Sequence, residues 1–269
     1  MDTIENEITQ KLKDYAKSIN IDIFGIAGVD KLNERGRHGR RPQDIYPGCE
    51  AIIVFGIGIL DTYSKVFNAS LNPKIKDDQK NCLPAILLKL QTAKLRSYIR
   101  KKGYHSLDNT SSPLACGINE VRAFQQAGLG YVGESGNAIS EKYGPRMVLG
   151  VILTNAPLIL DLPFNENKCG ECQICKTFCI SKNIIGEGYS NPTNCVASTG
   201  NPDNQLLFSL NGYYICDMCH RKCPQGRFKF SSEECQGTWW DIMDRHERIP
   251  IAQYSTRRLS KGSSNLDEK

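Results

Sequence analysis

Eight of the twelve cysteines fall into two sets whose regular spacing limits what this chain can fold into. The first set reads C-x2-C-x2-C-x3-C, and the second ends in C-x2-C-x3-C followed directly by Pro224. The two sets consist of Cys169, Cys172, Cys175 and Cys179, and of Cys195, Cys216, Cys219 and Cys223. Because three thiolates at steps of three residues can surround one face of a cubane, the pattern predicts two [4Fe–4S] clusters and a redox protein.

The order of the cysteines also predicts which of them share a cluster. In two-cluster ferredoxins, the fourth cysteine of each run binds the other cluster. By this rule, we expect one cluster to be held by Cys169, Cys172, Cys175 and Cys223, and the other by Cys195, Cys216, Cys219 and Cys179. His220, which lies between two of these cysteines, is expected to support a ligand rather than to bind iron.

Zinc and disulfides are the alternative uses of such cysteines. Structural zinc takes four ligands, usually as two well-separated pairs, which a run of four at three-residue steps does not resemble. A disulfide framework needs an oxidising compartment, and the polar, acidic N-terminus lacks the apolar stretch of a signal peptide. Four cysteines lie outside the pattern and are expected to be free, mostly buried thiols: Cys49, Cys82, Cys116 and Cys235.

Composition and charge exclude a membrane-spanning protein. The longest strongly apolar stretch, residues 51–60, is half the length that is needed to span a bilayer. A hydrophobic share of 40% supports a buried core, and the net charge of +5 is only a mild basic excess, for which solvated basic faces are the simplest account. We therefore expect a soluble, cytoplasmic protein without a membrane partner.

Hydrophobic periodicity predicts an α/β layer in the first part of the chain. Helices are expected over residues 4–19 and 121–126, and apolar strands over 21–27, 51–60 and 147–154, the second of them covered on both faces. A further helix is expected to begin near Pro84, to end at Gly103, and to turn one face inward, consisting of Leu83, Ile86, Leu87 and Leu90. Alternating helices and strands indicate an α/β fold.

The composition changes after Pro163, where cysteine, glycine and asparagine become frequent and periodicity fades. Such a segment is typical of a small loop-rich module whose folding depends on bound metal. We therefore expect three parts: an α/β cofactor and substrate domain over 1–162, a ferredoxin-like two-cluster domain over 163–235, and a C-terminal extension over 236–269.

A glycine-rich segment, residues 127–137, is the second informative feature. Gly128, Gly130 and Gly133 form G-x-G-x-x-G, but they follow a helical stretch, whereas a dinucleotide-binding turn follows a strand. The glycines permit two interpretations. They can form a tight loop with left-handed backbone angles, or they can bring bare backbone against a large flat cofactor.

Together these motifs resemble the epoxyqueuosine reductase family and the related reductive dehalogenases. The similarity includes the Ala-Gly-Leu-Gly-aromatic-hydrophobic-Gly loop, the Ile139-Ser-x-x-Tyr143-Gly144 segment before an apolar strand, and the double-cluster cysteines. Arg41-Pro42 and Tyr46-Pro-Gly48 resemble further elements of the family. The similar region runs from about residue 10 to about residue 230, most of the chain.

The resemblance implies a nitroreductase-like α/β domain that binds cobalamin and packs against a ferredoxin-like module. The clusters would supply low-potential electrons to the cobalt, and the cofactor would carry the difficult chemistry. Gly128, Gly130, Gly133 and Glu134 would contact the cofactor or substrate. The family's proton-donating aspartate corresponds most nearly to Asp108, for which a turn-forming role is the alternative. Tyr143 would donate a proton or merely pack, and Cys116 would line the cavity or be a buried thiol.

Two departures from the family pattern bear on the substrate. Gly133-Glu134-Ser135 stands where the family usually has Gly-Lys-Asn, and only a short tail follows Cys235, where epoxyqueuosine reductases continue into helical repeats that engage tRNA. We therefore expect a short form that acts on a small molecule or a corrinoid protein rather than tRNA, with a ferredoxin or flavodoxin as electron donor. A non-catalytic activator of a corrinoid enzyme, or a flavin in place of cobalamin, remains an alternative.

Overall fold

A computed structural model describes residues 2–33, 40–58, 77–108, 118–179, 181–186, 188–190 and 218–226, and these lie in one compact unit that spans residues 1–227. The helices are α1 (Asp2–Ser18), α2 (Asp30–Asn33), α3 (Pro42–Ile45), α5 (Asp77–Lys101), α6 (Glu120–Gln126), α7 (Ile174–Phe178) and α9 (Met218–Arg221). The strands are β1 (Ile23–Gly28), β2 (Ala51–Gly58), β3 (Ser106–Asp108), β4 (Tyr131–Val132), β5 (Ala138–Ile139), β6 (Met147–Thr154), β7 (Ile184–Gly186) and β8 (Tyr189–Ser190). The domain boundaries at 162 and 235 stay predictions.

The core of the fold is a four-stranded antiparallel sheet in the order β1-β2-β6-β3. Hydrophobic side chains cover both of its faces. In β2, Ile53 and Phe55 belong to the cluster that contains residues of α1 and α5, whereas Ile52 and Val54 belong to the cluster that contains residues of α6. Since successive side chains of a strand point to opposite faces, a strand buried on both sides must be apolar throughout. All eight residues of β2 are buried, as the unbroken apolar stretch predicts.

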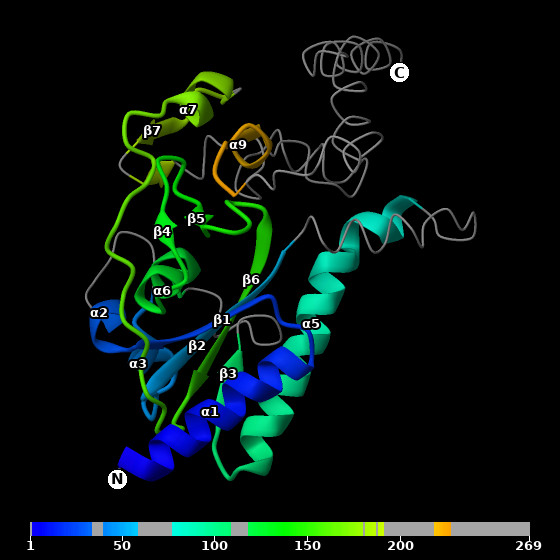
Figure 1. The fold of residues 1–269 in the computed structure, drawn as a ribbon, viewed down its shortest axis with the longest axis vertical. Helices are drawn as coiled ribbons and strands as arrows, with labels where there is room; N and C mark the ends of the chain where they lie inside the picture. The colour runs from blue at the N-terminus through cyan, green and yellow to red at the C-terminus, as the bar shows by residue number, and fades with distance from the viewer. Residues whose placement is uncertain are drawn as a thin grey trace, which may run out of the picture. The chain divides into compact units, whose positions relative to one another are not determined.

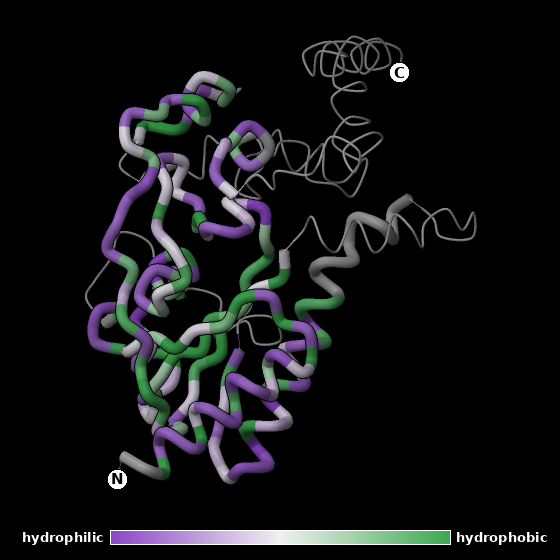
Figure 2. The backbone as a smooth tube through the Cα atoms, in the orientation of Figure 1, coloured by the Kyte–Doolittle hydropathy of each residue, from purple (hydrophilic) through white to green (hydrophobic). Residues whose placement is uncertain are grey.

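The helices occupy the two sides of this sheet. Figure 1 shows α1 and α5 lying alongside each other on one side, and α2, α3 and α6 on the other. In Figure 2 the central strands are mostly hydrophobic, whereas α1 alternates between hydrophobic and hydrophilic positions. This pattern is typical of a surface helix that turns one stripe toward the core. The predicted α/β fold is confirmed.

Most of the predicted elements are present in the structure, and the inner face of the long helix is the expected one only in part: Leu87 packs against the core. Helix α5 begins at Asp77, seven residues before Pro84. Leu90 was expected inside and is 53% exposed, whereas the buried positions include Leu88, Leu95 and Ile99. The contiguous apolar residues 86–88 fit more than one helical stripe, and packing selects the stripe that continues through positions 95 and 99. The side chains of Leu83 and Ile86 lie outside the described residues.

The elements that carry the cysteines gather at one end of the sheet. Figure 1 shows α7, β7 and α9 beyond the β4–β5 hairpin, and helix α7 contacts both α9 and β7. None of the helices in the described ranges combines the length and apolar character that crossing a bilayer requires.

Candidate metal centre

Four cysteines from both ends of the double motif surround one pocket. Cys169 and Cys172 come from the turn that leads into α7, Cys175 lies in the first turn of α7, and Cys223 follows α9. The pocket has a volume of about 340 Å³, including its part open to solvent. Its remaining wall is formed by Gly133, Glu134, Ser135, Ile139, Pro224 and Gln225. The fold thus brings together the four cysteines that the sequence pattern assigns to one cluster.

The chemistry of these thiols suits a polynuclear iron site. Cys169, Cys172, Cys175 and Cys223 form no disulfide in the structure. Burial raises the pKa of Cys175 and Cys223, and the neighbouring thiols act in the same direction, so the groups crowd one another as anions. Such crowding is relieved when the thiolates bind cations.

The spacing of the ligands separates a cluster from a single metal ion. Among the described His, Cys, Asp and Glu side chains, no three converge closely enough to hold one ion. Structural zinc takes four ligands, usually as two well-separated pairs, unlike the run of cysteines at three-residue steps that lines this pocket. Three such cysteines and one from the other motif line a single pocket, so the residues present fit a [4Fe–4S] cluster.

The second set of cysteines is described in part. Cys195 and Cys216 lie outside the described residues, and Cys179 and Cys219 are both partly buried. Burial alone would raise the pKa of Cys179, but hydrogen bonds from Ser181 and from the backbone N–H groups of Asn183 and Ile184 outweigh it and lower the pKa. The Asn183 N–H donates to the Cys179 sulfur over 3.3 Å. These donors favour a thiolate, which is the form that binds iron.

Asn137 connects the glycine-rich loop to the second cysteine set. Its Nδ2 donates to the Cys219 sulfur over 3.4 Å and to the Ser135 hydroxyl over 2.9 Å. Ser135 lines the pocket of the first set. The loop over residues 133–137 therefore contacts both sets of cysteines.

Arg146 holds the segment that carries Cys223, and sequence reasoning did not identify it. The side chain is only 4% exposed. Its guanidinium donates to the His220 carbonyl over 2.9 Å, to the Cys223 carbonyl over 3.1 Å, and also to the Gln225 carbonyl. His220 thus contributes a backbone contact near the site. The sequence does place a charged residue directly before the apolar strand β6. A charged side chain that is buried there needs hydrogen-bond or ion-pair partners.

Two glycine turns meet behind the Cys223 segment. Gly144 and Gly226 have φ angles of +58° and +60°, a region that glycine adopts without steric cost. A Cβ atom on Gly144 would overlap the Gln225 carbonyl, and one on Gly226 would overlap the Gly144 nitrogen. The two backbones are therefore in direct contact, and the contact fixes Cys223 relative to the turn before β6.

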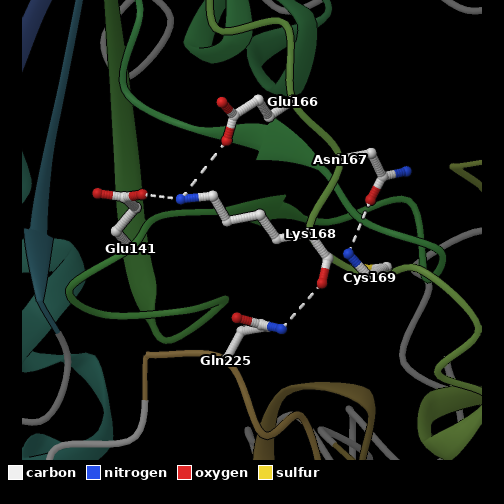
Figure 3. A network of polar contacts seen from close by, with 6 residues as sticks. All are labelled: Glu141, Glu166, Asn167, Lys168, Cys169 and Gln225. Atoms are coloured by element: carbon white, nitrogen blue, oxygen red, sulfur yellow. Dashed lines mark hydrogen bonds and ion pairs between the residues drawn. The ribbon is translucent and has the colours of Figure 1, made fainter.

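A polar network fixes the other side of the pocket (Figure 3). The Cys169 N–H donates to Asn167 Oδ1 over 2.9 Å, and Gln225 Nε2 donates to the Lys168 carbonyl over 3.1 Å. The Lys168 ammonium pairs with Glu141. The network connects the first cysteine of one motif to the turn after the last cysteine of the other.

The glycine-rich loop is explained by contacts within the protein. Residues 127–130 lie between α6 and β4, in the order that argues against a dinucleotide-binding turn. A Cβ atom on Gly128 would lie 2.5 Å from the Leu162 carbonyl, and one on Gly130 would overlap the Ile139 carbonyl. On Gly133 it would lie 2.7 Å from Ile139 and 3.5 Å from the Cys169 sulfur. Gly128 and Gly130 thus allow backbone carbonyls of the same chain to pack closely against them, and Gly133 lies beside the cysteine pocket.

Glu134 faces the cysteine module. It lines the pocket, its side chain is 16% exposed, and a carboxylate oxygen lies 3.4 Å from the ammonium of Lys176 in α7. A Cβ atom on Gly186 would lie 2.8 Å from the Glu134 carboxylate and overlap the Lys176 ammonium. This ion pair connects the loop to α7. Contact between Glu134 and a cofactor or substrate stays a prediction.

The two candidate proton donors do not line the cysteine pocket. Asp108 is fully buried in β3 and pairs with Arg96 of α5 over 2.5 Å. Tyr143 is fully buried, its N–H donates to the Ser140 hydroxyl over 2.8 Å, and its ring lies against Gly58. The structure thus shows an ion pair for the Asp108 side chain and packing for the Tyr143 ring. A part for either side chain in proton transfer stays a prediction. Cys49 is buried as expected, whereas Cys116, Cys235 and the Cys82 side chain lie outside the described residues.

Replacing Asp108 with alanine is expected to lower the free energy of unfolding by about 3–5 kcal/mol, because the Arg96 guanidinium would lose its buried counter-charge. Urea unfolding followed by circular dichroism measures this loss. As the control, Asp44→Ala removes an exposed carboxylate that pairs with Arg41 and should cost about 1 kcal/mol or less. Equal losses in the two variants would contradict a structural role for the buried pair. A folded Asp108→Asn variant that lost only turnover would instead favour the proton donor.

Comparisons with known proteins agree with these features. No family model matches the chain. It is 33% identical to an epoxyqueuosine reductase of Staphylococcus aureus over 256 residues, covering 82% of this chain and 65% of the relative. It is 26% identical to the Vibrio cholerae epoxyqueuosine reductase over 257 residues, covering 82% and 68%.

Solved structures show the same fold. The epoxyqueuosine reductase of Streptococcus thermophilus superposes with a TM-score of 0.60 at 19% identity, over 82% of this chain and 66% of that one. A reductive dehalogenase whose structure suggests a mechanism for B12-dependent dehalogenation superposes with a TM-score of 0.58 at 15% identity, over 94% and 36%. The chain spans about two thirds of the length of the two epoxyqueuosine reductases from Vibrio cholerae and Staphylococcus aureus. In sequence the chain is similar to epoxyqueuosine reductases, and it shares its fold with them and with reductive dehalogenases.

Proposed function

We propose that this chain is an iron–sulfur reductase that passes electrons from two [4Fe–4S] clusters to a corrinoid or a substrate in its α/β domain. The observation that carries the proposal is the pocket lined by Cys169, Cys172, Cys175 and Cys223. The three closely spaced cysteines of one motif and the last cysteine of the other meet there, which is the arrangement that a two-cluster ferredoxin requires.

The chain's own residues would hold and shield the first cluster. Its four cysteines would be the ligands, and Ile139 and the bare backbone of Gly133 would cover one side. Arg146 would fix the Cys223 segment and place a positive charge near a group whose charge is negative. Burial, nearby charge and hydrogen bonds to sulfur are the means by which a protein sets a cluster's potential.

A corrinoid is the proposed electron acceptor, on the strength of the similarity to epoxyqueuosine reductases and to a B12-dependent dehalogenase. When bound, it would supply the reductive chemistry, and the protein would supply electrons and position the reactants. The Cβ directions of Gly128 and Gly130 are occupied by the carbonyls of Leu162 and Ile139, and contact of these glycines with a corrinoid stays a prediction. We further propose that the substrate is a small molecule or a corrinoid protein rather than tRNA, and that a ferredoxin or flavodoxin donates the electrons.

Iron and sulfide analysis of the anaerobically purified chain tests the first part of the proposal. About eight irons and eight sulfides per chain are expected, together with a brown colour and an electron paramagnetic resonance (EPR) signal after reduction. A colourless protein that contains zinc would overturn the proposal.

The acceptor is tested by adding cobalamin to the reduced, iron-loaded protein. A change in the absorption spectrum of cobalamin is expected if the chain binds and reduces it. Turnover of a small electrophile would identify an enzyme, whereas reduction of a partner corrinoid protein without substrate turnover would identify an activator. Tight binding of a tRNA stem loop, such as the one found with a related epoxyqueuosine reductase, would contradict the proposed substrate class.

A further inference from the structure

The hydroxyl group of Tyr131 is buried beside the cysteine pocket without a partner. Tyr131 lies in β4, within the glycine-rich segment, and is 1% exposed. Its ring packs in a small hydrophobic cluster with Ile139, Cys169 and Cys223, and its centroid lies 6.0 Å from that of Phe164. Among the described residues, no group forms a hydrogen bond with the hydroxyl oxygen.

Such a hydroxyl group needs an explanation, because buried tyrosines usually place it against a hydrogen-bond partner. The packing of the ring alone would be served equally well by phenylalanine, which carries no polar atom to desolvate. A buried donor left unsatisfied is costly and often marks a missing water or ion. The oxygen therefore indicates that an acceptor occupies the neighbouring space in the loaded protein.

The surroundings identify the kind of acceptor. The ring of Tyr131 packs in one cluster with Cys169 and Cys223, so two of the pocket cysteines lie beside it. A phenol hydroxyl carries one proton that it can donate in a hydrogen bond. The hydroxyl approaches Cys169 without reaching hydrogen-bond geometry. The buried donor thus lies beside cysteines of the pocket, whose sulfur atoms can accept a hydrogen bond.

We propose that the Tyr131 hydroxyl donates a hydrogen bond to a sulfur of the cluster held by Cys169, Cys172, Cys175 and Cys223, and so positions that cluster and raises its reduction potential. The inference rests on the proposed function. A donor to sulfur stabilises the reduced cluster more than the oxidised one, because the reduced cluster carries the greater negative charge. The effect is local and should spare the second cluster.

Tyr131→Phe removes the hydroxyl group and keeps the ring. In an EPR-monitored redox titration, one cluster should become harder to reduce by about tenfold in its equilibrium constant, which is about 59 mV for a one-electron couple. The other cluster should keep its potential, and the iron content should stay full. The control is Tyr98→Phe, since Tyr98 stacks on Tyr15 with centroids 4.3 Å apart in the core beneath the sheet. This control should leave both potentials unchanged.

The iron-free protein provides a second readout. In wild type without iron the hydroxyl is unsatisfied, so Tyr131→Phe should unfold at the same urea concentration as wild type or at a higher one. Pulsed EPR of the wild-type protein in D2O should show an exchangeable deuteron coupled to one cluster, and this coupling should be missing in Tyr131→Phe.

The outcomes separate this inference from the proposed function. A wild-type chain that binds no iron would overturn both. Full iron with unchanged potentials in Tyr131→Phe, or no coupled deuteron in wild type, would overturn the role of Tyr131 alone. An equal potential shift in Tyr98→Phe would also overturn it, because the shift would then not depend on the hydroxyl at the pocket.

Discussion

Replacing Cys223 with alanine is expected to remove one whole cluster and with it about four of about eight irons. Cys223 is the last cysteine of the second motif, yet it shares a pocket with the first three cysteines of the first motif. Its loss should therefore abolish the same EPR signal that is lost when Cys169 is replaced. Iron analysis and EPR of the reduced protein measure both effects.

Paired substitutions test this assignment directly. Cys169→Ala combined with Cys223→Ala should lose no more iron than either variant alone, because both residues serve one cluster. Cys169→Ala combined with Cys219→Ala should lose nearly all the iron, because these residues serve different clusters. Non-additivity of this kind identifies groups that act together. Additive loss in the first pair would contradict the shared site.

Cys49→Ala is the matched control for these variants. The Cys49 thiol is buried, and burial raises its pKa to about 11, so it has little tendency to form the thiolate that binds iron. Both clusters should remain in this variant. Loss of iron from it would show that iron binding depends on thiols outside the two motifs.

The sequence was most informative where chemistry demands a fixed spacing or a fixed periodicity. Cluster ligands must lie at set intervals, so the grouping of Cys169, Cys172, Cys175 and Cys223 could be predicted before the fold was known. The β2 strand could be predicted because burial on both faces requires an unbroken apolar stretch. In α5 the apolar positions fit several stripes, and the exposed Leu90 shows that the choice between them depends on tertiary packing.

The residues that support the pocket could not be predicted in the same way. Tyr131, Asn137 and Arg146 reach the cysteines only because β4, the following loop and the turn before β6 lie beside α7 and α9. No local pattern encodes that proximity. The glycine-rich loop was ambiguous for the same reason: Gly128 and Gly130 allow close approach, but only the fold shows that the approaching groups are the chain's own carbonyls.

Replacing Arg146 with methionine is expected to loosen the Cys223 segment and to weaken iron retention. The guanidinium donates to the carbonyls of His220, Cys223 and Gln225 from a position that is 4% exposed, and methionine fills similar space without a donor. Hydrogen bonds from a charged group contribute about 1.5–3 kcal/mol each, and part of the loss is recovered when water reaches the carbonyls. We expect a net cost of about 3 kcal/mol, which is roughly a 100-fold change in the opening equilibrium.

This loss should be confined to one part of the protein. Hydrogen exchange followed by mass spectrometry should show faster exchange over residues 218–226 and little change in β2, because the three carbonyls that Arg146 binds lie in residues 218–226. Iron transfer to a chelator should be correspondingly faster. Arg146→Lys should recover only part of the effect, since one ammonium cannot reproduce the fixed fork of a guanidinium. Arg122→Met on the exposed face of α6 is the control and should behave like wild type. If Arg146→Met kept iron as firmly as Arg122→Met, the carbonyl contacts would not be what holds Cys223 at the pocket.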